Sequence, residues 1–197
     1  MRLILASSSS YRHQMLQRLG IPFTAVAPQV DETALAEETP AALAQRLSVL
    51  KALEVAATHP DAIVIGSDQV ATIDGEPIGK PGNYDRAYAQ LRRLSGQTVQ
   101  FHSALCVYGA TRTEVDDVIT VCRFRTLNDD EIVAYLEREQ PFDTAGSAKA
   151  ESLGIALMES MRSDDPTAII GLPLIALTRM LRSFGVNPLT HGWPTRP

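Results

Sequence analysis

The N-terminal segment places an apolar run directly before a hydroxyl-rich stretch. Residues 3–6 are apolar, residues 7–10 are all serine, and Tyr11, Arg12 and His13 follow. A buried strand that leads into small residues and then into a helix gathers unpaired backbone N–H groups and an arginine at one place. Such N–H groups and the positive end of the helix dipole both attract an anion. The segment therefore predicts a phosphate site at a strand-to-helix junction.

Strands and helices alternate through the first hundred residues. Thr39 is a typical N-cap and Pro40 a typical first helical residue, so a helix is expected to begin there. Gly20 favours a helix end, and the Asp74-Gly75 pair favours a tight turn. Hydrophobic periodicity predicts strands at residues 3–6, 23–26 and 62–65, and helices at residues 10–19, 40–58 and 84–94.

A β-hairpin is expected in the middle of the chain. Residues 98–108 and 113–125 have the pattern of two long strands joined near Gly109. The remaining expected elements are a helix from residue 127 capped by Asn128, a strand at residues 155–158, and helices that start at Pro166 and Pro173. Alternation at both ends with a hairpin between them predicts an α/β fold, with one mixed sheet, helices on its faces and a cleft between two halves.

Charge and hydropathy exclude several classes of protein. The chain of 197 residues has a net charge of −5, whereas a nucleic-acid surface needs a basic patch. No apolar run is long enough to span a bilayer, and the N-terminus lacks the layout of a secretory signal peptide. We therefore expect a cytoplasmic protein that acts on a small molecule, with neither nucleic acid nor a membrane as its partner.

The two cysteines lie in the two strands of the predicted hairpin. A turn near Gly109 places Cys106 opposite the region of Val115, which leaves Cys122 elsewhere along the hairpin. We expect buried, reduced thiols and no disulfide, as is usual for a cytoplasmic protein.

Two acidic positions follow predicted strands. Asp68 comes shortly after the apolar run at residues 62–65, and ligands of α/β folds collect outside the carboxyl ends of strands. Asp31 and Glu32 follow the preceding strand, and paired acids there suit a hard cation. Each position also has a simpler interpretation, because Asp68 could form a turn and residues 31–33 could be a solvated helix start.

The chain has three lysines, Lys51, Lys80 and Lys149. Lys80 lies in a Gly-Lys-Pro-Gly loop and Lys149 in a loop of small residues, where a lysine favours a phosphate contact. Lys51 falls inside a predicted helix, so an exposed helical charge is its simpler interpretation.

Common nucleotide-binding and hydrolase motifs are missing. The sequence has no P-loop pattern and no Gly-x-Gly-x-x-Gly after a strand, which excludes P-loop and dinucleotide-binding folds. The serines after Ala6 have no visible His/Asp partners, which argues against a serine hydrolase.

Taken together, the segments resemble the Maf-like nucleotide pyrophosphatase family over residues 1–189, with residues 190–197 as a flexible tail. Each motif is short, but their number and order are specific. The resemblance implies an elongated, twisted mixed sheet with flanking helices and two lobes around a central cleft, as in ITPase-like folds. The motifs are Leu-Ala-Ser7-Ser-Ser9 followed by Arg12, Val30-Asp31-Glu32, Lys51-Ala, Gly66-Ser-Asp68-Gln69, Gly79-Lys80-Pro81, Ala145-Gly146 and Gly171-Leu-Pro173-Leu.

The resemblance also implies an enzyme that uses a divalent metal cation, Mg²⁺ or Mn²⁺, to cleave nucleoside triphosphates into a monophosphate and pyrophosphate. Asp68 matches the catalytic acid and, together with Glu32, the metal site. A homodimer is common in such families. His13 departs from the family pattern, which commonly has two adjacent arginines there. The expected phosphate-binding residues are Ser7, Ser9, Arg12, Lys51, Lys80 and Lys149.

The loop at residues 146–154 resembles the branch of the family that acts on 7-methyl-GTP, with Tyr11, Gln69 and Glu151 at the substrate-specificity positions. A carboxylate such as Glu151 can accept two N–H donors of guanine side by side. Methylation at N7 makes the base cationic, so a carboxylate and an aromatic face both favour it. Two alternatives stay open: a pyrophosphatase for dTTP, UTP or a broader range of nucleotides, and a non-catalytic nucleotide-binding regulator of cell division.

Overall fold

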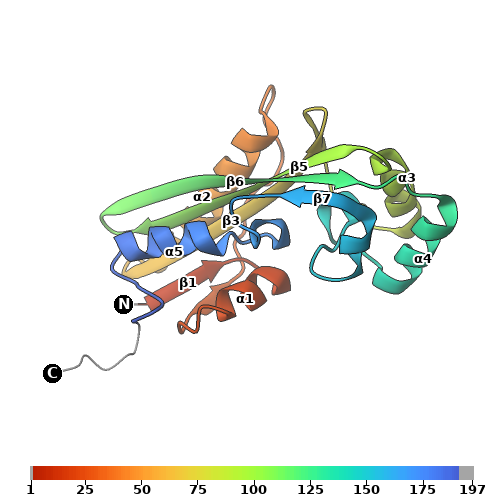
Figure 1. Cartoon of the computed structure of the whole chain (residues 1–197). Helices are drawn as coiled ribbons and strands as arrows, with labels where there is room; N and C mark the ends of the chain where they lie inside the picture. Colours follow the sequence, from red (N-terminus) through yellow and green to blue (C-terminus); the bar gives the residue numbers. More distant parts are fainter. Residues whose placement is uncertain (1, 191–197) are drawn as a thin grey trace.

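The computed structural model describes residues 2–190, which form one elongated mixed sheet flanked by helices (Figure 1). The predicted tail at residues 190–197 lies outside this range except for Thr190. The seven strands of the described range are β1 (Arg2–Ala6), β2 (Thr24–Val26), β3 (Ala62–Ile73), β4 (Glu76–Ile78), β5 (Thr98–Gly109), β6 (Arg112–Phe124) and β7 (Met158–Arg162). Its five α-helices are α1 (Ser10–Gln17), α2 (Pro40–Ala57), α3 (Tyr84–Leu94), α4 (Asp129–Glu139) and α5 (Leu174–Ser183).

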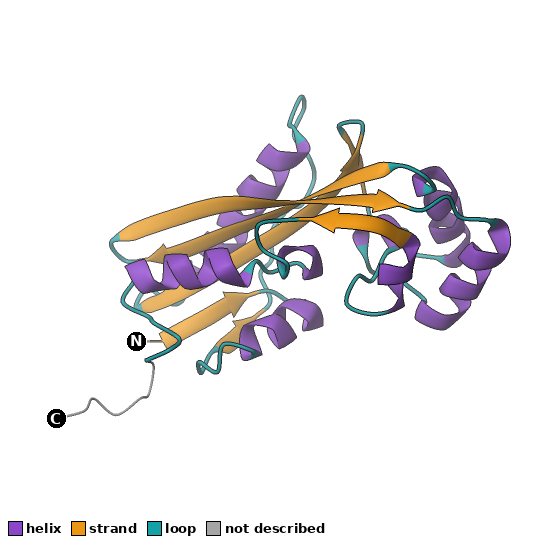
Figure 2. Cartoon of the chain, viewed as in Figure 1, coloured by secondary structure: helices purple, strands orange, loops and turns teal. Residues whose placement is uncertain are grey.

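The sheet changes from parallel to antiparallel pairing at β3 (Figure 2). Its order is β2-β1-β3-β5-β6-β7, in which β2, β1 and β3 run parallel and the later neighbours pair antiparallel. The pairing of β1 with β3 ends at Ala6 and Gly66, and β4 folds back on β3 from Ala71 onward. Residues 67–70 of β3 therefore lie between these two partners, along one edge of the strand.

Helices pack on the two ends of this sheet as two lobes (Figure 1). α1 and α5 cover β1 and the first half of β3, through a core that includes Leu16 and Leu177. α3 and α4 cover the far ends of β3, β5 and β6, through a core that includes Phe101 and Leu136. α2 packs on the other face, where Val55 contacts the alternate side chains of the same strands. The predicted α/β fold with two lobes on a mixed sheet is confirmed.

Local capping explains where the helices begin. The Thr39 side-chain oxygen accepts from the Ala42 N–H at 3.2 Å, ahead of Pro40 at the first helical position. Asn128 and Glu131 form a capping box at the start of α4. Both starts agree with the sequence prediction.

One correction concerns the position of Asp68. The sequence places it in a loop after a strand, but β3 continues to Ile73 and Asp68 lies inside it. The strand continues because β5 pairs antiparallel with β3 from Val64 to Thr72. Long-range pairing therefore overrides the weak strand propensity of the glycine, serine and aspartate at residues 66–68.

Two further corrections lie in the C-terminal third. The strand expected at residues 155–158 is a 3₁₀ helix, Leu153–Leu157, and β7 begins only at Met158. The chain after Pro166 forms a short 3₁₀ turn, Ala168–Ile170, in place of the expected helix. Asp165 is buried and accepts from the N–H groups of Ile175 and Ala176, so it caps α5 and not a helix of its own.

The cysteines agree with the predicted hairpin register. Cys106 pairs with Val115, and both cysteines are buried and free of disulfides. Burial raises the pKa of Cys106 and of Cys122 to about 12, so neither thiol is reactive at neutral pH. Within residues 2–190, no helix has the length and apolar character needed to cross a membrane.

Candidate active site

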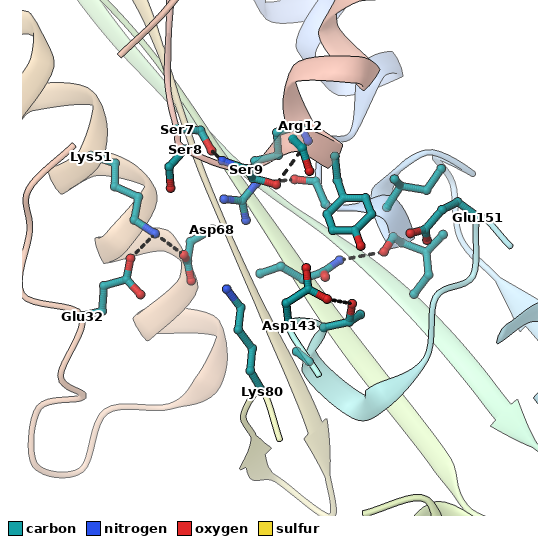
Figure 3. Close-up of a pocket in the computed structure, with 18 of the residues that line it drawn as sticks. Ser7, Ser8, Ser9, Arg12, Glu32, Lys51, Asp68, Lys80, Asp143 and Glu151 are labelled. Atoms are coloured by element: carbon teal, nitrogen blue, oxygen red, sulfur yellow. Dashed lines mark hydrogen bonds and ion pairs between the residues drawn. The ribbon is translucent and has the colours of Figure 1, made fainter. Parts of the chain in front are cut away.

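A cavity of about 400 Å³ opens at the uncovered edge of β3 (Figure 3). Its walls come from the loops after β1, β2 and β4, the start of α1, α2, β3 and two loops of the C-terminal half. Every site residue predicted from the sequence borders this cavity except Lys149. Segments that lie far apart in the chain therefore meet at one place.

The interrupted edge of β3 explains how residues inside a strand reach a ligand. Asp68 and Gln69 are neighbours, so their side chains leave opposite faces of the sheet. Both still border the cavity, because within residues 2–190 no strand pairs along this edge between Gly66 and Ala71. The gap between β1 and β4 thus opens both faces of the sheet to one cavity.

Lys51 lies between two carboxylates (Figure 3). Its Nζ is 2.6 Å from Asp68 Oδ1 and 2.7 Å from Glu32 Oε1. Lys51 and Asp68 are buried, with 6% and 8% of their surfaces exposed, whereas Glu32 is open to solvent. The simpler interpretation of Lys51 as a solvated helical charge is wrong.

Gly66 allows α2 to approach β3 closely. A Cβ atom at Gly66 would lie 2.1 Å from the backbone oxygen of Ser48 and 2.9 Å from the backbone nitrogen of Ala52. Any side chain larger than hydrogen would push the helix away. Lys51 stands between these two helical residues, so this contact fixes its position beside Asp68.

Arg12 supplies another cation at the same end of the cavity. Its Nε donates to the backbone oxygen of Gly171 at 2.9 Å, which leaves the terminal Nη groups for an anion. Burial lowers the pKa of Arg12 and the charges of Asp68 and Glu32 oppose this, but an arginine stays protonated at neutral pH. Burial acts to raise the pKa of Glu32, yet the hydrogen bond and charge of Lys51 hold it below its usual value.

Ser7 and Ser9 shape the turn between β1 and α1. Ser9 caps α1, because its Oγ accepts from the Arg12 N–H at 3.3 Å, and Ser7 Oγ accepts from the Ser9 N–H at 3.1 Å. Since both oxygens act as acceptors in these contacts, both hydroxyl hydrogens remain for donation to a phosphate. The loop therefore combines a helix N-terminus, hydroxyls and an arginine, as the sequence predicts.

The loop at residues 168–171 is held in place by side chains from β3 and β5. Gln69 Nε2 lies 3.0 Å from the oxygen of Ala168, 3.1 Å from that of Ile169 and 3.0 Å from Ser103 Oγ. Ser103 Oγ in turn donates to Ala168 at 2.8 Å. These contacts use the amide nitrogen of Gln69 fully, so its Oε1 is the group left for a ligand. Sequence analysis missed Ser103, because its partner lies 65 residues away.

The cavity wall across from Lys51 and Glu32 is formed by the loop from Asp143 to Glu151, with Glu151 at the end farther from Lys51 (Figure 3). Tyr11 also borders the cavity. The loop turns sharply at Gly146 and Ser147, which have φ values of +72° and +52°. Asp143 and Glu151 are both exposed carboxylates at the cavity wall. Asp143 was not among the residues singled out from the sequence.

Lys149 and His13 do not border the cavity. Lys149 Nζ donates to the backbone oxygen of Glu139 at 3.0 Å, at the C-terminal end of α4, where a cation offsets the helix dipole. The ring of His13 packs against Phe23, with ring centroids 5.0 Å apart. The geometry therefore does not bring Lys149 to the expected phosphate site.

Glu32 and Asp68, the two carboxylates that contact Lys51, are the candidate ligands for a metal ion in this cavity. Within residues 2–190 there is no group of three or more His, Cys, Asp or Glu side chains arranged for a metal ion. Mg²⁺ commonly binds through one or two carboxylates plus the phosphate oxygens of a substrate. Lys51 contacts one oxygen of each carboxylate, so the other oxygens remain for such a cation. The donor chemistry fits a hard divalent cation that binds together with a phosphate ligand.

The fold and the cavity define an α/β protein that is suited to a phosphate-containing ligand at the edge of its sheet. Its fold is similar to that of a HAM1 protein from Coxiella burnetii, with a TM-score of 0.52 over 93% of this chain and 99% of that chain, at 14% identity. Residues 2–184 match the family described as Maf-like protein, and the chain belongs to this family.

Several curated relatives are similar along almost their whole length. A 7-methyl-GTP pyrophosphatase of Bordetella pertussis is 69% identical, over 96% of this chain and 95% of its own. A protein of the same name from Burkholderia orbicola is 60% identical, over 92% of this chain and 89% of its own. The family resemblance inferred from the short motifs is confirmed.

Proposed function

We propose that this protein hydrolyses 7-methyl-GTP to 7-methyl-GMP and pyrophosphate. Relatives of that name at 69% and 60% identity support the substrate. The observation that carries the proposal is the arrangement of charge along one cavity, with Arg12, Lys51 and Lys80 toward one end and Glu151 at the other (Figure 3). A triphosphate joined to a cationic base has the complementary distribution of charge.

The cationic end suits the triphosphate. Arg12, Lys51 and Lys80 would stabilise the negative charge that grows on the pyrophosphate leaving group. The hydroxyls of Ser7 and Ser9, with the N–H groups of the same loop, would hold the phosphate chain in one orientation. Removal of any one of these cations is expected to weaken binding and slow the reaction.

Asp68 is the proposed catalytic residue. Its carboxylate, fixed by Lys51 at 2.6 Å, would orient or deprotonate the water that attacks the phosphorus. We propose that Glu32 and Asp68 also hold Mg²⁺ or Mn²⁺ with the substrate. When bound, such an ion neutralises phosphate charge and lowers the pKa of water.

The acidic end suits a methylated guanine. Guanine presents two adjacent N–H donors, and both Glu151 and the free Oε1 of Gln69 are acceptors at the cavity wall. Thymine and uracil present one N–H between two carbonyl oxygens, which a row of acceptors would repel. Tyr11 offers an aromatic face to the cationic base.

The cytoplasmic location and a homodimer stay predictions.

The test is a pyrophosphate-release assay with 7-methyl-GTP, GTP, dTTP, UTP and CTP, each with Mg²⁺, with Mn²⁺ and with a chelator. We expect the highest kcat/KM for 7-methyl-GTP and no turnover with the chelator. A clear preference for dTTP or UTP would assign the chain to the broader alternative. Tight nucleotide binding without pyrophosphate release would instead favour the regulator of cell division.

Glu151→Gln separates base recognition from chemistry. The variant replaces an acceptor with a side chain that also donates, so the preference for 7-methyl-GTP over UTP should fall about 10-fold or more while pyrophosphate is still released. Glu137→Gln, an exposed position on α4 outside the cavity, is the matched control. An unchanged base preference in Glu151→Gln would show that Glu151 does not select the base.

A further inference from the structure

Asp143 is a carboxylate at the cavity wall that none of the proposed steps uses. It is exposed, and within residues 2–190 no lysine, arginine or histidine forms an ion pair with it. In the described part of the chain, its side-chain hydrogen bond is with the neighbouring Thr144, whose Oγ1 donates to Oδ1 at 3.4 Å. Both carboxylate oxygens therefore keep accepting capacity toward the cavity.

Backbone contacts place Asp143 between the two ends of the cavity. The Gly82 N–H donates to the oxygen of Phe142 at 2.9 Å, so the residue before Asp143 is tied to the loop that carries Lys80. The rings of Phe142 and Tyr84 also meet edge to face, 6.5 Å apart. In the other direction the same loop leads to Glu151, and the carboxylate of Asp143 lies between Lys80 and Glu151 in Figure 3.

In a nucleoside triphosphate, the ribose lies between the phosphates and the base. Its 2′- and 3′-hydroxyls are adjacent neutral donors, and a carboxylate can accept from both. An unpaired acid beside the phosphates would repel them, whereas the sugar is the uncharged part of the substrate. The position and the charge of Asp143 thus fit a contact with the ribose better than a contact with the phosphates or with the base.

We propose that Asp143 accepts hydrogen bonds from the ribose hydroxyls and makes the enzyme favour ribonucleotides over nucleotides without these hydroxyls. This inference rests on the proposed pyrophosphatase function and adds the recognition of the sugar to it. Asp143 is a substrate-binding residue in this scheme and takes no part in the attack of water.

The test compares kcat/KM for 7-methyl-GTP, its 2′-deoxy form and its 2′,3′-dideoxy form. We expect the wild type to favour the ribonucleotide over the dideoxy form by about 10-fold to 100-fold, the range of a hydrogen bond to a charged group. Asp143→Ala should remove most of this preference, mainly through the KM of the ribonucleotide, and Asp143→Asn should remove part of it. Asp61→Asn, an exposed acid outside the cavity, should leave it unchanged.

Three results would overturn the inference. The first is equal rates for the ribo and dideoxy forms in the wild type. The second is a preference for the ribonucleotide that is unchanged in Asp143→Ala. The third is an Asp143→Ala variant in which only the preference for 7-methyl-GTP over GTP changes. The last would make Asp143 a contact of the cationic base. If the wild type cleaves UTP and not 7-methyl-GTP, the proposed function fails by itself. The sugar comparison is then made with UTP and its dideoxy form, and the same outcomes decide it.

Discussion

The two ends of the cavity are built in different ways. The cluster of Lys51, Asp68 and Glu32 draws two of its members from a helix and a central strand, and both of these are buried. The opposite wall is a loop from Asp143 to Glu151, with a 3₁₀ turn at Ala145–Ser147, positive φ angles and exposed carboxylates. One end is fixed by packing, and the other is carried by a surface loop.

This difference suggests a division of labour. Groups that carry a reaction must be held to within a fraction of an ångström, which a buried contact between a helix and a sheet supplies. Groups that select a base or sugar gain from a loop whose side chains can change without disturbing the core. Substitutions at the packed end, around Lys51 and Asp68, should therefore affect kcat and stability. Substitutions at the loop end, residues 143–151, should affect the choice of substrate.

The largest expected effect is that of Asp68→Asn. The change keeps the shape of the side chain but removes the carboxylate, so kcat should fall about 10²-fold to 10⁴-fold while the fold persists. Steady-state kinetics and circular dichroism measure the two properties. The matched control is Asp74→Asn, in the turn at the end of the same strand, where asparagine tolerates the φ of +52°. Activity near the wild-type value in Asp68→Asn would refute its catalytic role.

Gly66→Ala tests whether the packed end depends on the close approach of α2. The added methyl group would overlap the backbone oxygen of Ser48, so we expect a loss of about 1–3 kcal/mol in the free energy of unfolding. Activity should also fall in the fraction that stays folded, since Lys51 moves away from Asp68. Urea denaturation measures the stability.

A matched glycine provides the control for this variant. A Cβ atom at Gly79 would meet nothing within 4 Å, so Gly79→Ala should unfold at nearly the wild-type urea concentration. If both variants unfold alike, the contact between α2 and β3 does not limit stability.

Lys51→Met tests the electrostatics of the same cluster. Lys51 holds the pKa of Glu32 below its usual 4.5 against the effect of burial, so its removal should raise that pKa. In the wild type the resulting stabilisation is present above pH 4.5 and is lost as the pH falls through the lowered pKa. The acid limb of the kcat/KM profile should therefore move to higher pH in the variant.

The control for this pH shift is an ion pair away from the cavity. Arg46 holds the pKa of Glu38 at about 2, and neither residue borders the cavity. Arg46→Met should leave the acid limb of the activity profile in place. Equal pH profiles for Lys51→Met and the wild type would show that Glu32 does not control activity.

The same contrast explains what could be predicted from the sequence. Local signals such as the Thr39 cap and the opening serines identified helix starts correctly, because their partners lie within a few residues. The burial of Lys51 and the location of Asp68 inside β3 depend on pairing with distant segments, which periodicity does not report. The contacts of Ser103 and Asp165 were missed for the same reason.

The smallest expected effect concerns Lys149, the predicted phosphate residue that lies outside the cavity. Its ammonium group bonds to the end of α4, so Lys149→Met should cost about 0.3–1 kcal/mol of stability and change KM by less than about 2-fold. Lys80→Met, at a lysine that borders the cavity, should raise KM about 10-fold. Both variants lose one positive charge, so the general attraction of a charged substrate changes equally in each. If KM rises as much in Lys149→Met as in Lys80→Met, Lys149 does contact the phosphates. The loop from Asp143 to Glu151 must then move when substrate binds.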